Sequence, residues 1–366
     1  MPEFVLPSFA IGTGGLAGNP QNSALNTDLE VQISVIRESL QQFKAHHMRV
    51  WIDSALHYGA GNALKAIGMA LGKEPGKDTV LSIKVGRILE APTPDTPYEP
   101  SSFCGEAHFN RRFDYSESGV LRAFRQSFEF LNAGRVQQGW QPVEPGDLDM
   151  VVFVHDPETG VHGDKTDFII QQVRHEALPA LRELRRTGKI KAVGVGTNEI
   201  TCALKLAGHA DLDLLMIAGR LTLLSNSALR APAQIQQDTA GLTELLQEAK
   251  KHRKSIISAA PGQSGMLYEG GTWYNYQPAP NEIITFRESI RAVFDKYHVP
   301  LTAGALQFPL LAGAKAIVCG ICSNQELANN LAYFSHNIPQ ALWCDLEAQD
   351  LIGRIILKNG SPVNAA

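Results

Sequence analysis

Short apolar runs alternate along the chain with longer segments in which apolar residues recur every three or four positions. The run at 148–155, LDMVVFVH, is almost continuously apolar, which is typical of a parallel strand buried on both faces. In the segment 30–46, Val31, Val35 and Phe43 belong to an apolar stripe with the helical period. The alternation of these two patterns predicts strands that are each followed by a helix.

Applied to the whole chain, the patterns predict strands at 9–13, 50–53, 80–85, 148–155, 190–197, 212–217, 255–260 and 316–321. They predict helices at 30–46, 63–71, 120–130, 168–187, 200–207, 241–252, 282–297, 301–311 and 324–334. The segment 90–116 is rich in Pro and aromatic residues and is expected to be irregular. About eight strand–helix repeats favour a closed (β/α)₈ TIM barrel over an open doubly wound sheet. No linker divides the sequence, so a single domain spanning 1–366 is expected.

Composition excludes several classes of protein. The 366 residues are 44% hydrophobic and 19% charged, as in soluble globular proteins, and the net charge of −4 predicts no affinity for nucleic acid or anionic membranes. No apolar run is long enough to span a membrane, and the first residues lack the features of a secretory signal. The five scattered cysteines fit a cytoplasmic location. Cys319 and Cys322 lie in an apolar run, so inert thiols are expected there and no metal site.

Polar residues stand where several predicted strands end. Asp53 ends one strand, Lys84 and His155 end the two that follow, and Tyr58 lies just beyond Asp53, ahead of a glycine-rich turn. The chemistry of a closed barrel collects at the carboxyl ends of its strands, so these four side chains are expected to converge. Asp53 would hold Lys84 as an ammonium ion, and Lys84 would lower the pKa of Tyr58. Tyr58 could then transfer protons near neutral pH while His155 orients a substrate oxygen.

Each of these residues alone has a simpler explanation. A strand-end Asp is usually a helix cap, a lone Lys is usually solvated, and a His or Tyr in a turn is usually packed or hydrogen-bonded. Four such residues at successive strand ends of one repeating pattern favour catalysis instead.

Several longer motifs make the sequence similar to the aldo-keto reductase family over nearly its whole length. The motifs are IGTGG, IDSALHYGAG, LSIKVGR, VVFVHDP and GKIKAVGVGTNE, with paired asparagines in the helix near the C-terminus. KVGRIL, FDYSESGV, GRLTLLSNSA, SAAPGQSGML, YNYQPAP and LTAGALQFPL resemble its aldose 1-dehydrogenases, which act on sugars such as D-threo-aldoses, L-fucose and L-galactose. Where the family usually has Ser-Glu after the glycine-rich turn, this chain has Ala63 and Leu64.

The resemblance implies an NAD(P) cofactor and hydride transfer between nicotinamide and a carbonyl carbon. It implies that Tyr58 is the proton donor or acceptor, tuned by Asp53 and Lys84, and that His155 orients the substrate. Thr197 and Asn198 would bind the nicotinamide carboxamide. The cofactor contacts it implies are Gly14, Asp53, Thr197, Asn198, Ala260, Pro261, Ser264, Gly265, Gly320, Glu326, Asn329 and Asn330.

The segment 318–330 bears on the choice of cofactor. Family members that prefer NADP carry Lys or Arg here to meet the 2′-phosphate, whereas this segment has neither and places Glu326 where Arg is common. A carboxylate repels the phosphate, and a free ribose hydroxyl is accepted. We therefore expect NAD to be preferred, with NADP as the alternative.

Substrate contacts are expected from loops beyond the strand ends, where aromatic rings stack on the C–H faces of sugars. The candidates are Trp51, His57, Phe103, Trp273 and Tyr276. Trp51 lies in a strand and could instead pack beneath the site, and residues 273–276 could fold over the cofactor pyrophosphate.

Three hypotheses follow for function. The first is an NAD-dependent dehydrogenase that oxidises the anomeric carbon of an aldose to a lactone. The second, on the same scaffold, is an NADPH-dependent aldehyde or ketone reductase, or a dehydrogenase of the pyridoxal type. The third is a nucleotide-sensing subunit without catalysis, which the complete set of four residues disfavours. A small-molecule substrate is the expected partner of a monomer or small homo-oligomer.

Overall fold

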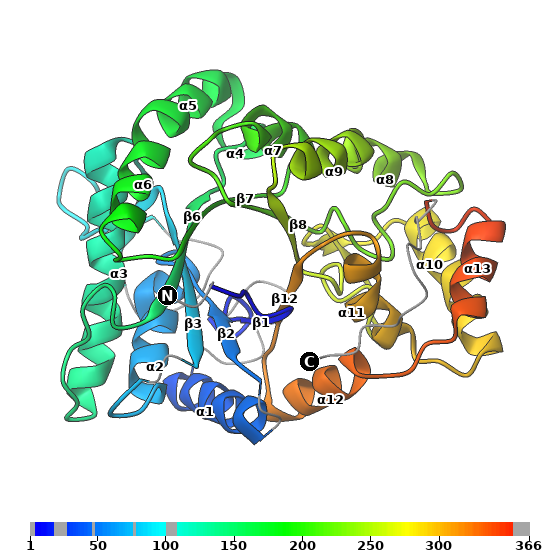
Figure 1. Cartoon of the computed structure of the whole chain (residues 1–366), viewed down its shortest axis with the longest axis horizontal. Helices are drawn as coiled ribbons and strands as arrows, with labels where there is room; N and C mark the ends of the chain where they lie inside the picture. Colours follow the sequence, from blue (N-terminus) through cyan, green and yellow to red (C-terminus); the bar gives the residue numbers. More distant parts are fainter. Residues whose placement is uncertain (1–3, 18–27, 46–47, 76–77, 100–107, 354–366) are drawn as a thin grey trace. The chain divides into compact units, whose positions relative to one another are not determined.

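The computed structural model describes residues 4–17, 28–45, 48–75, 78–99 and 108–353. Eight parallel strands form a closed barrel in the order β1-β12-β9-β8-β7-β6-β3-β2 (Figure 1). Their bounds are β1 Phe9–Gly12, β2 Val50–Asp53, β3 Thr79–Val85, β6 Asp149–His155, β7 Ala192–Thr197, β8 Leu214–Ala218, β9 Ser255–Ala259 and β12 Ala316–Gly320. The predicted fold class is confirmed.

Helices follow the strands, and the apolar periodicity predicts most of them; those at 159–162, 233–238 and 340–348 were not predicted. The helices are α1 Leu29–Ala45, α2 Asn62–Ala70, α3 Glu117–Gln137, α4 Thr159–His162, α5 Thr166–Gln172, α6 Leu178–Arg186, α7 Ile200–Ala207, α8 Ala233–Asp238, α9 Leu242–Lys251, α10 Asn281–Lys296, α11 Leu301–Leu311, α12 Asn324–Phe334 and α13 Gln340–Ala348. None of the helices in the described ranges combines the length and hydropathy of a membrane-spanning segment.

By its internal contacts the chain divides into two compact units. Unit 1 comprises Met1–Gly196, His209–Leu214 and Gly320–Leu327, and unit 2 comprises Thr197–Gly208, Leu215–Cys319 and Ala328–Ala366. Unit 2 has its own apolar core, in which the Phe294 and Trp343 rings meet edge to face with centroids 5.9 Å apart. The single domain over 1–366 stays a prediction.

Two parts of the predicted pattern are wrong. The helix expected at 168–187 is interrupted by a π-helical turn, Val173–Ala177, directly before α6. Pro179, at the start of α6, has no N–H to donate to the preceding turn, which explains the change of hydrogen-bond spacing.

The segment 90–116 is not irregular throughout. Residues Asn110–Phe113 form β5, which pairs antiparallel with β4, Arg87–Glu90, just after β3. The polar sequence NRRF has weak strand propensity, so its pairing with β4 decides its conformation. A second hairpin that the pattern did not predict joins β10, Trp273–Tyr274, to β11, Gln277–Pro278.

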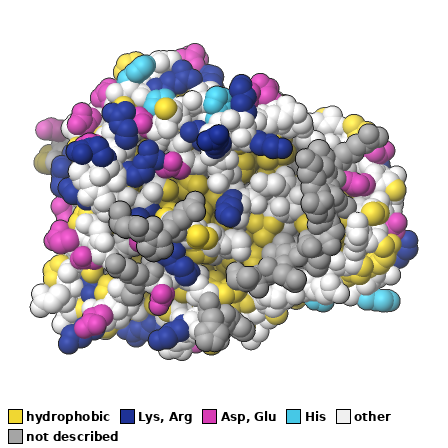
Figure 2. Space-filling view, viewed as in Figure 1, with side chains coloured by type: hydrophobic (Ala, Val, Ile, Leu, Met, Phe, Trp, Pro, Cys, Tyr) yellow, Lys and Arg dark blue, Asp and Glu magenta, His cyan; other side chains and the backbone are white. Residues whose placement is uncertain are grey.

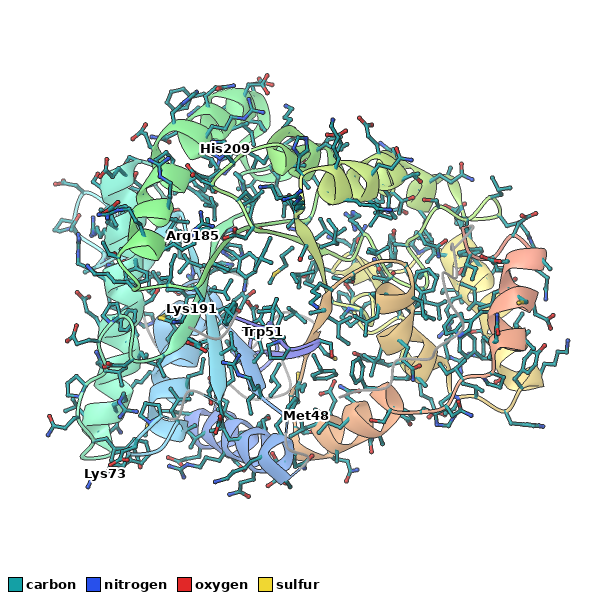
Figure 3. All side chains as sticks on the ribbon, viewed as in Figure 1. Met48, Trp51, Lys73, Arg185, Lys191 and His209 are labelled. Atoms are coloured by element: carbon teal, nitrogen blue, oxygen red, sulfur yellow. The ribbon has the colours of Figure 1, made fainter. Side chains whose placement is uncertain are left out.

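Basic side chains gather over α6 on the face seen in Figure 2, and Figure 3 labels Arg185 and Lys191 on either side of the turn that follows this helix. The arginines of α6 are paired with carboxylates, so their charge is balanced locally. The pairs are Arg182–Asp211 at 3.2 Å, Arg185–Asp213, and Arg186–Glu183 at 2.7 Å.

Helices α2 and α3 lie side by side in unit 1 and approach closely (Figure 1). A Cβ atom added to Gly68 would lie 1.9 Å from the carbonyl oxygen of Leu131, and one added to Gly134 would lie 2.0 Å from that of Lys65. Both neighbours are backbone atoms, so only glycine allows this approach.

We expect Gly68→Ala to lower the free energy of unfolding by about 1–3 kcal/mol, because the added methyl group forces α2 and α3 apart. This cost should exceed the gain from the higher helix propensity of Ala. Urea unfolding followed by circular dichroism measures this change. Gly208→Ala is the matched control, since its added Cβ would lie 3.6 Å from His252 Nε2, an ordinary contact. Equal stability of the two variants would contradict the packing argument.

Candidate active site

A buried ion pair joins the ends of β2 and β3. The two strands are in parallel register with Asp53 opposite Ser82, which brings Lys84, two residues further on, over Asp53. Lys84 Nζ donates to Asp53 Oδ2 at 2.5 Å and to the Ser54 carbonyl oxygen at 3.2 Å. Each side chain of the pair is only 4% exposed, so water contributes little to solvating either charge.

The second carboxylate oxygen of Asp53 is held from beneath. Ser82 Oγ donates to Asp53 Oδ1 at 2.6 Å, and the Trp51 indole N–H donates to Ser82 Oγ at 2.9 Å. Trp51, labelled in Figure 3, is fully buried. Trp51 therefore supports the Asp53 carboxylate through Ser82, which agrees with the interpretation that it packs beneath the site. Its burial does not agree with the prediction that it contacts the substrate.

Tyr58 lies in the short 3₁₀ turn Tyr58–Gly61, which leads from β2 into α2. Lys84 Nζ is 4.8 Å from the centroid of the Tyr58 ring. A Cβ added to Gly14 would lie 3.5 Å from Tyr58 Cζ, so the chain after β1 runs close to the phenol. The absence of a side chain at Gly14 leaves room beside the ring.

His155 ends β6 and completes the cluster. Its ring centroid is 6.3 Å from that of Tyr58, with the rings perpendicular at 89°, and 6.4 Å from that of His57. The structure thus brings together the four residues predicted to converge, and all of them belong to unit 1. Their chemical roles stay predictions.

Burial and charge set the protonation of the pair formed by Tyr58 and Lys84. Burial raises the pKa of Tyr58 above 10.0, although the charge and hydrogen bond of Lys84 lower it. Lys84 lowers the pKa of Tyr58 as predicted, but the larger effect of burial contradicts the expectation of a pKa near neutral. Burial opposes the charge on Lys84, but Asp53 and Tyr58 outweigh it and raise the Lys84 pKa, so the ammonium ion persists.

The two histidines of the cluster are neutral. Burial, followed by the charge of Arg87, holds the pKa of His155 well below 6.5. Burial, followed by Arg87 and Arg111, lowers the pKa of His57 to about 2. Neutral imidazole can donate one hydrogen bond and accept another, which suits His155 to orienting a substrate oxygen.

A second ion pair, which sequence reasoning missed, lies beside His155. Arg87 at the start of β4 pairs with Asp156, whose Oδ2 is 3.4 Å from His155 Nε2. Tyr115 donates its hydroxyl hydrogen to the His155 carbonyl oxygen at 2.7 Å. Asp156 directly follows His155 in VHDP, and Arg87 lies three residues after Lys84 in KVGR, so their closeness to predicted site residues was the available signal.

Gly86 makes this arrangement feasible between Lys84 and Arg87. Its φ of +98° turns the chain from β3 into β4, and an added Cβ would lie 2.5 Å from the Tyr115 ring. Any other residue would strain the turn and displace Tyr115, so the two cationic side chains depend on a glycine between them.

Comparison with known proteins identifies the family. The sequence profile of the aldo/keto reductase family matches residues 10–350. The chain belongs to the aldo-keto reductase family. It is therefore an oxidoreductase of a family that uses NAD(P)H, and its partner is a small molecule with a carbonyl group or a sugar.

Two characterised aldo-keto reductases are similar over most of their lengths. Pyridoxal 4-dehydrogenase of Microbacterium luteolum is 31% identical over 315 residues, which cover 82% of this chain and 84% of the relative. D-threo-aldose 1-dehydrogenase of a Pseudomonas species is 29% identical over 313 residues, with the same coverage. The resemblance to aldose 1-dehydrogenases is thus confirmed, beside an equal resemblance to a pyridoxal dehydrogenase.

Solved structures of aldo-keto reductases share the fold. The glycerol dehydrogenase of Gluconobacter oxydans has a TM-score of 0.64 at 16% identity and covers 100% of this chain and 98% of its own. An aldo/keto reductase of Klebsiella pneumoniae, solved with NADP and acetate, has a TM-score of 0.58 at 15% identity, covering 95% and 93%.

The predicted cofactor contacts lie at strand ends and in the following turns. In unit 2, Thr197 ends β7 and Asn198 follows it, Ala260 and Pro261 follow β9, and Ser264 and Gly265 form the next turn. Asn329 is exposed on α12, whereas Asn330 is buried with its amide 3.5 Å from Cys319 Sγ. Their contacts with a cofactor stay predictions.

Glu326 caps the turn between β12 and α12. Ser323 Oγ accepts from the Glu326 N–H at 3.1 Å, and Glu326 Oε2 accepts from the Cys322 N–H at 2.8 Å. Burial raises the pKa of Glu326, although the hydrogen bonds from Cys322 lower it. A Cβ added to Gly320 would meet no atom within 4 Å. The contact of this turn with a cofactor stays a prediction.

The remaining substrate candidates are dispersed. His57 lies in the cluster, 6.4 Å from His155 between ring centroids, whereas Trp273 and Tyr276 belong to the β10–β11 hairpin of unit 2. Phe103 lies outside the described residues. Cys319 is buried as expected, and Cys322 is half-buried.

We expect Asp53→Asn to lower the free energy of unfolding by ~3–5 kcal/mol, because it leaves the Lys84 ammonium buried without its counter-ion. Chemical denaturation monitored by Trp fluorescence measures this. The double variant Asp53→Asn, Lys84→Met removes the stranded charge and should recover most of the loss. If the single and double variants are equally unstable, the ion pair does not govern stability here.

Proposed function

We propose that this aldo-keto reductase is an NAD-dependent dehydrogenase that oxidises the anomeric carbon of an aldose to a lactone. The observation that carries the proposal is the position of Lys84 Nζ, 2.5 Å from Asp53 Oδ2 and 4.8 Å from the Tyr58 ring centroid. A phenol beside a permanently charged ammonium can release its proton and recover it, which is what an acid–base group in alcohol oxidation must do.

Each residue of the cluster has one task in this scheme. Tyr58, as phenolate, accepts the proton of the anomeric hydroxyl while the hydride leaves the same carbon, and the lactone carbonyl results. Lys84 stabilises the phenolate, and Asp53 keeps Lys84 charged and aimed at the ring. Neutral His155 donates a hydrogen bond to the anomeric oxygen and fixes the sugar. When bound, the nicotinamide cofactor supplies the hydride acceptor.

The similarity to D-threo-aldose 1-dehydrogenase supports an aldose as the substrate. A second candidate is an aldehyde or alcohol of the pyridoxal type, which the similarity to pyridoxal 4-dehydrogenase favours. The same four side chains would serve either substrate, since an alcohol, or the hydrate or internal hemiacetal of an aldehyde, also loses a proton from oxygen and a hydride from the same carbon. A substrate panel of aldoses and pyridoxal, followed by absorbance of the reduced cofactor, separates the two.

We expect Tyr58→Phe to lower kcat for the best substrate by about 10²–10⁴-fold, because it removes the acid–base group. Tyr297→Phe is the matched control, since it deletes a hydroxyl whose hydrogen bond, at 2.8 Å to Asp345, lies in unit 2. If Tyr58→Phe turns over substrate at the rate of the control, Tyr58 is not the acid–base group.

The raised pKa of Tyr58 adds a pH profile to the same prediction. The phenolate is scarce at neutral pH, so the rate of oxidation should rise from pH 7 to pH 10 by as much as about tenfold per unit. Carbonyl reduction uses the protonated phenol and should not fall over this range. An oxidation rate that is already maximal below pH 7 and stays constant above it would contradict the assignment of Tyr58 as the proton acceptor.

We expect a higher kcat/KM with NAD than with NADP, because the Glu326 carboxylate repels the 2′-phosphate. Glu326→Gln keeps an oxygen that can accept from the Cys322 N–H and removes the charge, so it should reduce the NAD preference several-fold. Initial rates with each cofactor at saturating substrate provide the comparison. A preference of the unsubstituted enzyme for NADP would overturn the proposal.

A further inference from the structure

The β4–β5 hairpin presents two arginines on one face. Arg87 lies opposite Phe113 and Leu89 lies opposite Arg111 in the antiparallel register. Since side chains alternate along a strand, Arg87, Arg111 and Phe113 point to the same side, which we call the Arg87–Arg111 face. The Arg87 guanidinium lies 4.4 Å from the Phe113 ring centroid. The intervening Arg112 points to the other side, where its Nε is 3.2 Å from Glu90 Oε2.

The Arg87–Arg111 face is turned toward the active site. Arg87 pairs with Asp156, whose Oδ2 is 3.4 Å from His155 Nε2. The charges of both arginines lower the pKa of His57, whose ring lies 6.4 Å from that of His155. The face therefore borders the space next to the two histidines.

Several donors on the Arg87–Arg111 face are not used. Arg87 Nε and Arg111 Nε and Nη1 are buried and donate to no acceptor in the described structure. Arg111 is hydrogen-bonded to Tyr98, and among the described residues no Asp or Glu forms an ion pair with it. Buried guanidinium N–H groups normally have partners, so these donors fit a ligand that supplies oxygen atoms.

The charge balance of the cluster points the same way. Asp53 neutralises Lys84 and Asp156 neutralises Arg87, whereas no carboxylate among the described residues pairs with Arg111. The neighbouring histidines are neutral and do not alter this sum. Each free N–H group of the Arg111 guanidinium can donate a charge-assisted hydrogen bond to a carboxylate or phosphate oxygen.

We propose that the Arg87–Arg111 face binds an oxyanion carried by the substrate, with Arg111 as the residue that selects it. The inference rests on the function proposed above and narrows it. The substrate is an aldose whose anomeric carbon meets Tyr58 and whose far end bears a carboxylate or phosphate group. A uronic acid and a sugar phosphate share this chemistry.

The test compares sugars that differ only at C6. We would measure kcat/KM with NAD for galactose, galacturonate and galactose 6-phosphate, and for the three corresponding glucose compounds. At least one anionic member should exceed its neutral parent by about tenfold or more, as charge-assisted hydrogen bonds would give. Comparing the uronic acid with the sugar 6-phosphate identifies which oxyanion is bound. Equal or lower values for both anionic sugars would overturn the inference while leaving aldose oxidation in place.

Variants of the hairpin assign the preference to Arg111. Arg111→Gln should lower the ratio of kcat/KM for the anionic sugar to that for its neutral parent to about one. Arg111→Lys should retain part of the preference for the anionic sugar because the charge remains. Arg112→Gln is the matched control, since it removes an adjacent charge on the opposite face and should leave the ratio intact. If Arg111→Gln keeps the ratio, or Arg112→Gln loses it equally, the Arg87–Arg111 face is not the site.

A binding measurement keeps the inference testable apart from turnover. Isothermal titration of the NAD-loaded protein with galacturonate, galactose 6-phosphate and galactose should show tighter binding of an anionic sugar, lost in Arg111→Gln. If no sugar is oxidised, the proposed function fails, yet this binding pattern would still support an oxyanion site. Absence of oxyanion binding would overturn the inference itself.

Discussion

The buried ion pair between Asp53 and Lys84 is the constraint on which the site depends. Two opposite charges at 2.5 Å, each almost inaccessible to water, are stable only if every remaining polar atom finds a partner. Ser82 and the Ser54 carbonyl oxygen supply those partners, and Trp51 in turn fixes Ser82. The parallel register of β2 and β3 is thereby linked to the orientation of one ammonium group, and the phenol of Tyr58 lies against that group.

A second ion pair, which is partly buried, links the barrel to the β4–β5 hairpin. Arg87 and Asp156 connect β4 to the residue that follows β6, and Tyr115 holds the His155 backbone from the same side. Burial, followed by the charges of nearby cations, lowers the pKa values of both histidines, while burial raises that of Tyr58. In the proposed function, proton transfer falls to the phenol, because the imidazoles stay neutral and Lys84 stays charged over the physiological range.

The two proposals place chemistry and substrate selection in different parts of unit 1. The strand ends and the turn after β2 carry the four side chains proposed for catalysis, whereas the hairpin inserted after β3 carries the arginines proposed to bind an oxyanion. Such a division lets one barrel serve several substrates, because the inserted loops can vary without disturbing the strand ends. Family members that share the four residues can therefore differ in what they oxidise.

The sequence by itself determined the barrel and the four converging residues. Parallel strands buried on both faces leave continuous apolar runs, and the carboxyl ends of such strands must meet at one end of a closed sheet, so Asp53, Lys84 and His155 could be placed together from their positions alone. Tertiary structure decided the rest. It decided the β4–β5 pairing and the Arg87–Asp156 ion pair, because these depend on which residues face one another across long sequence separations. It also decided the raised pKa of Tyr58, because this depends on how far water is excluded from the phenol. Neither property produces a periodic pattern in the sequence.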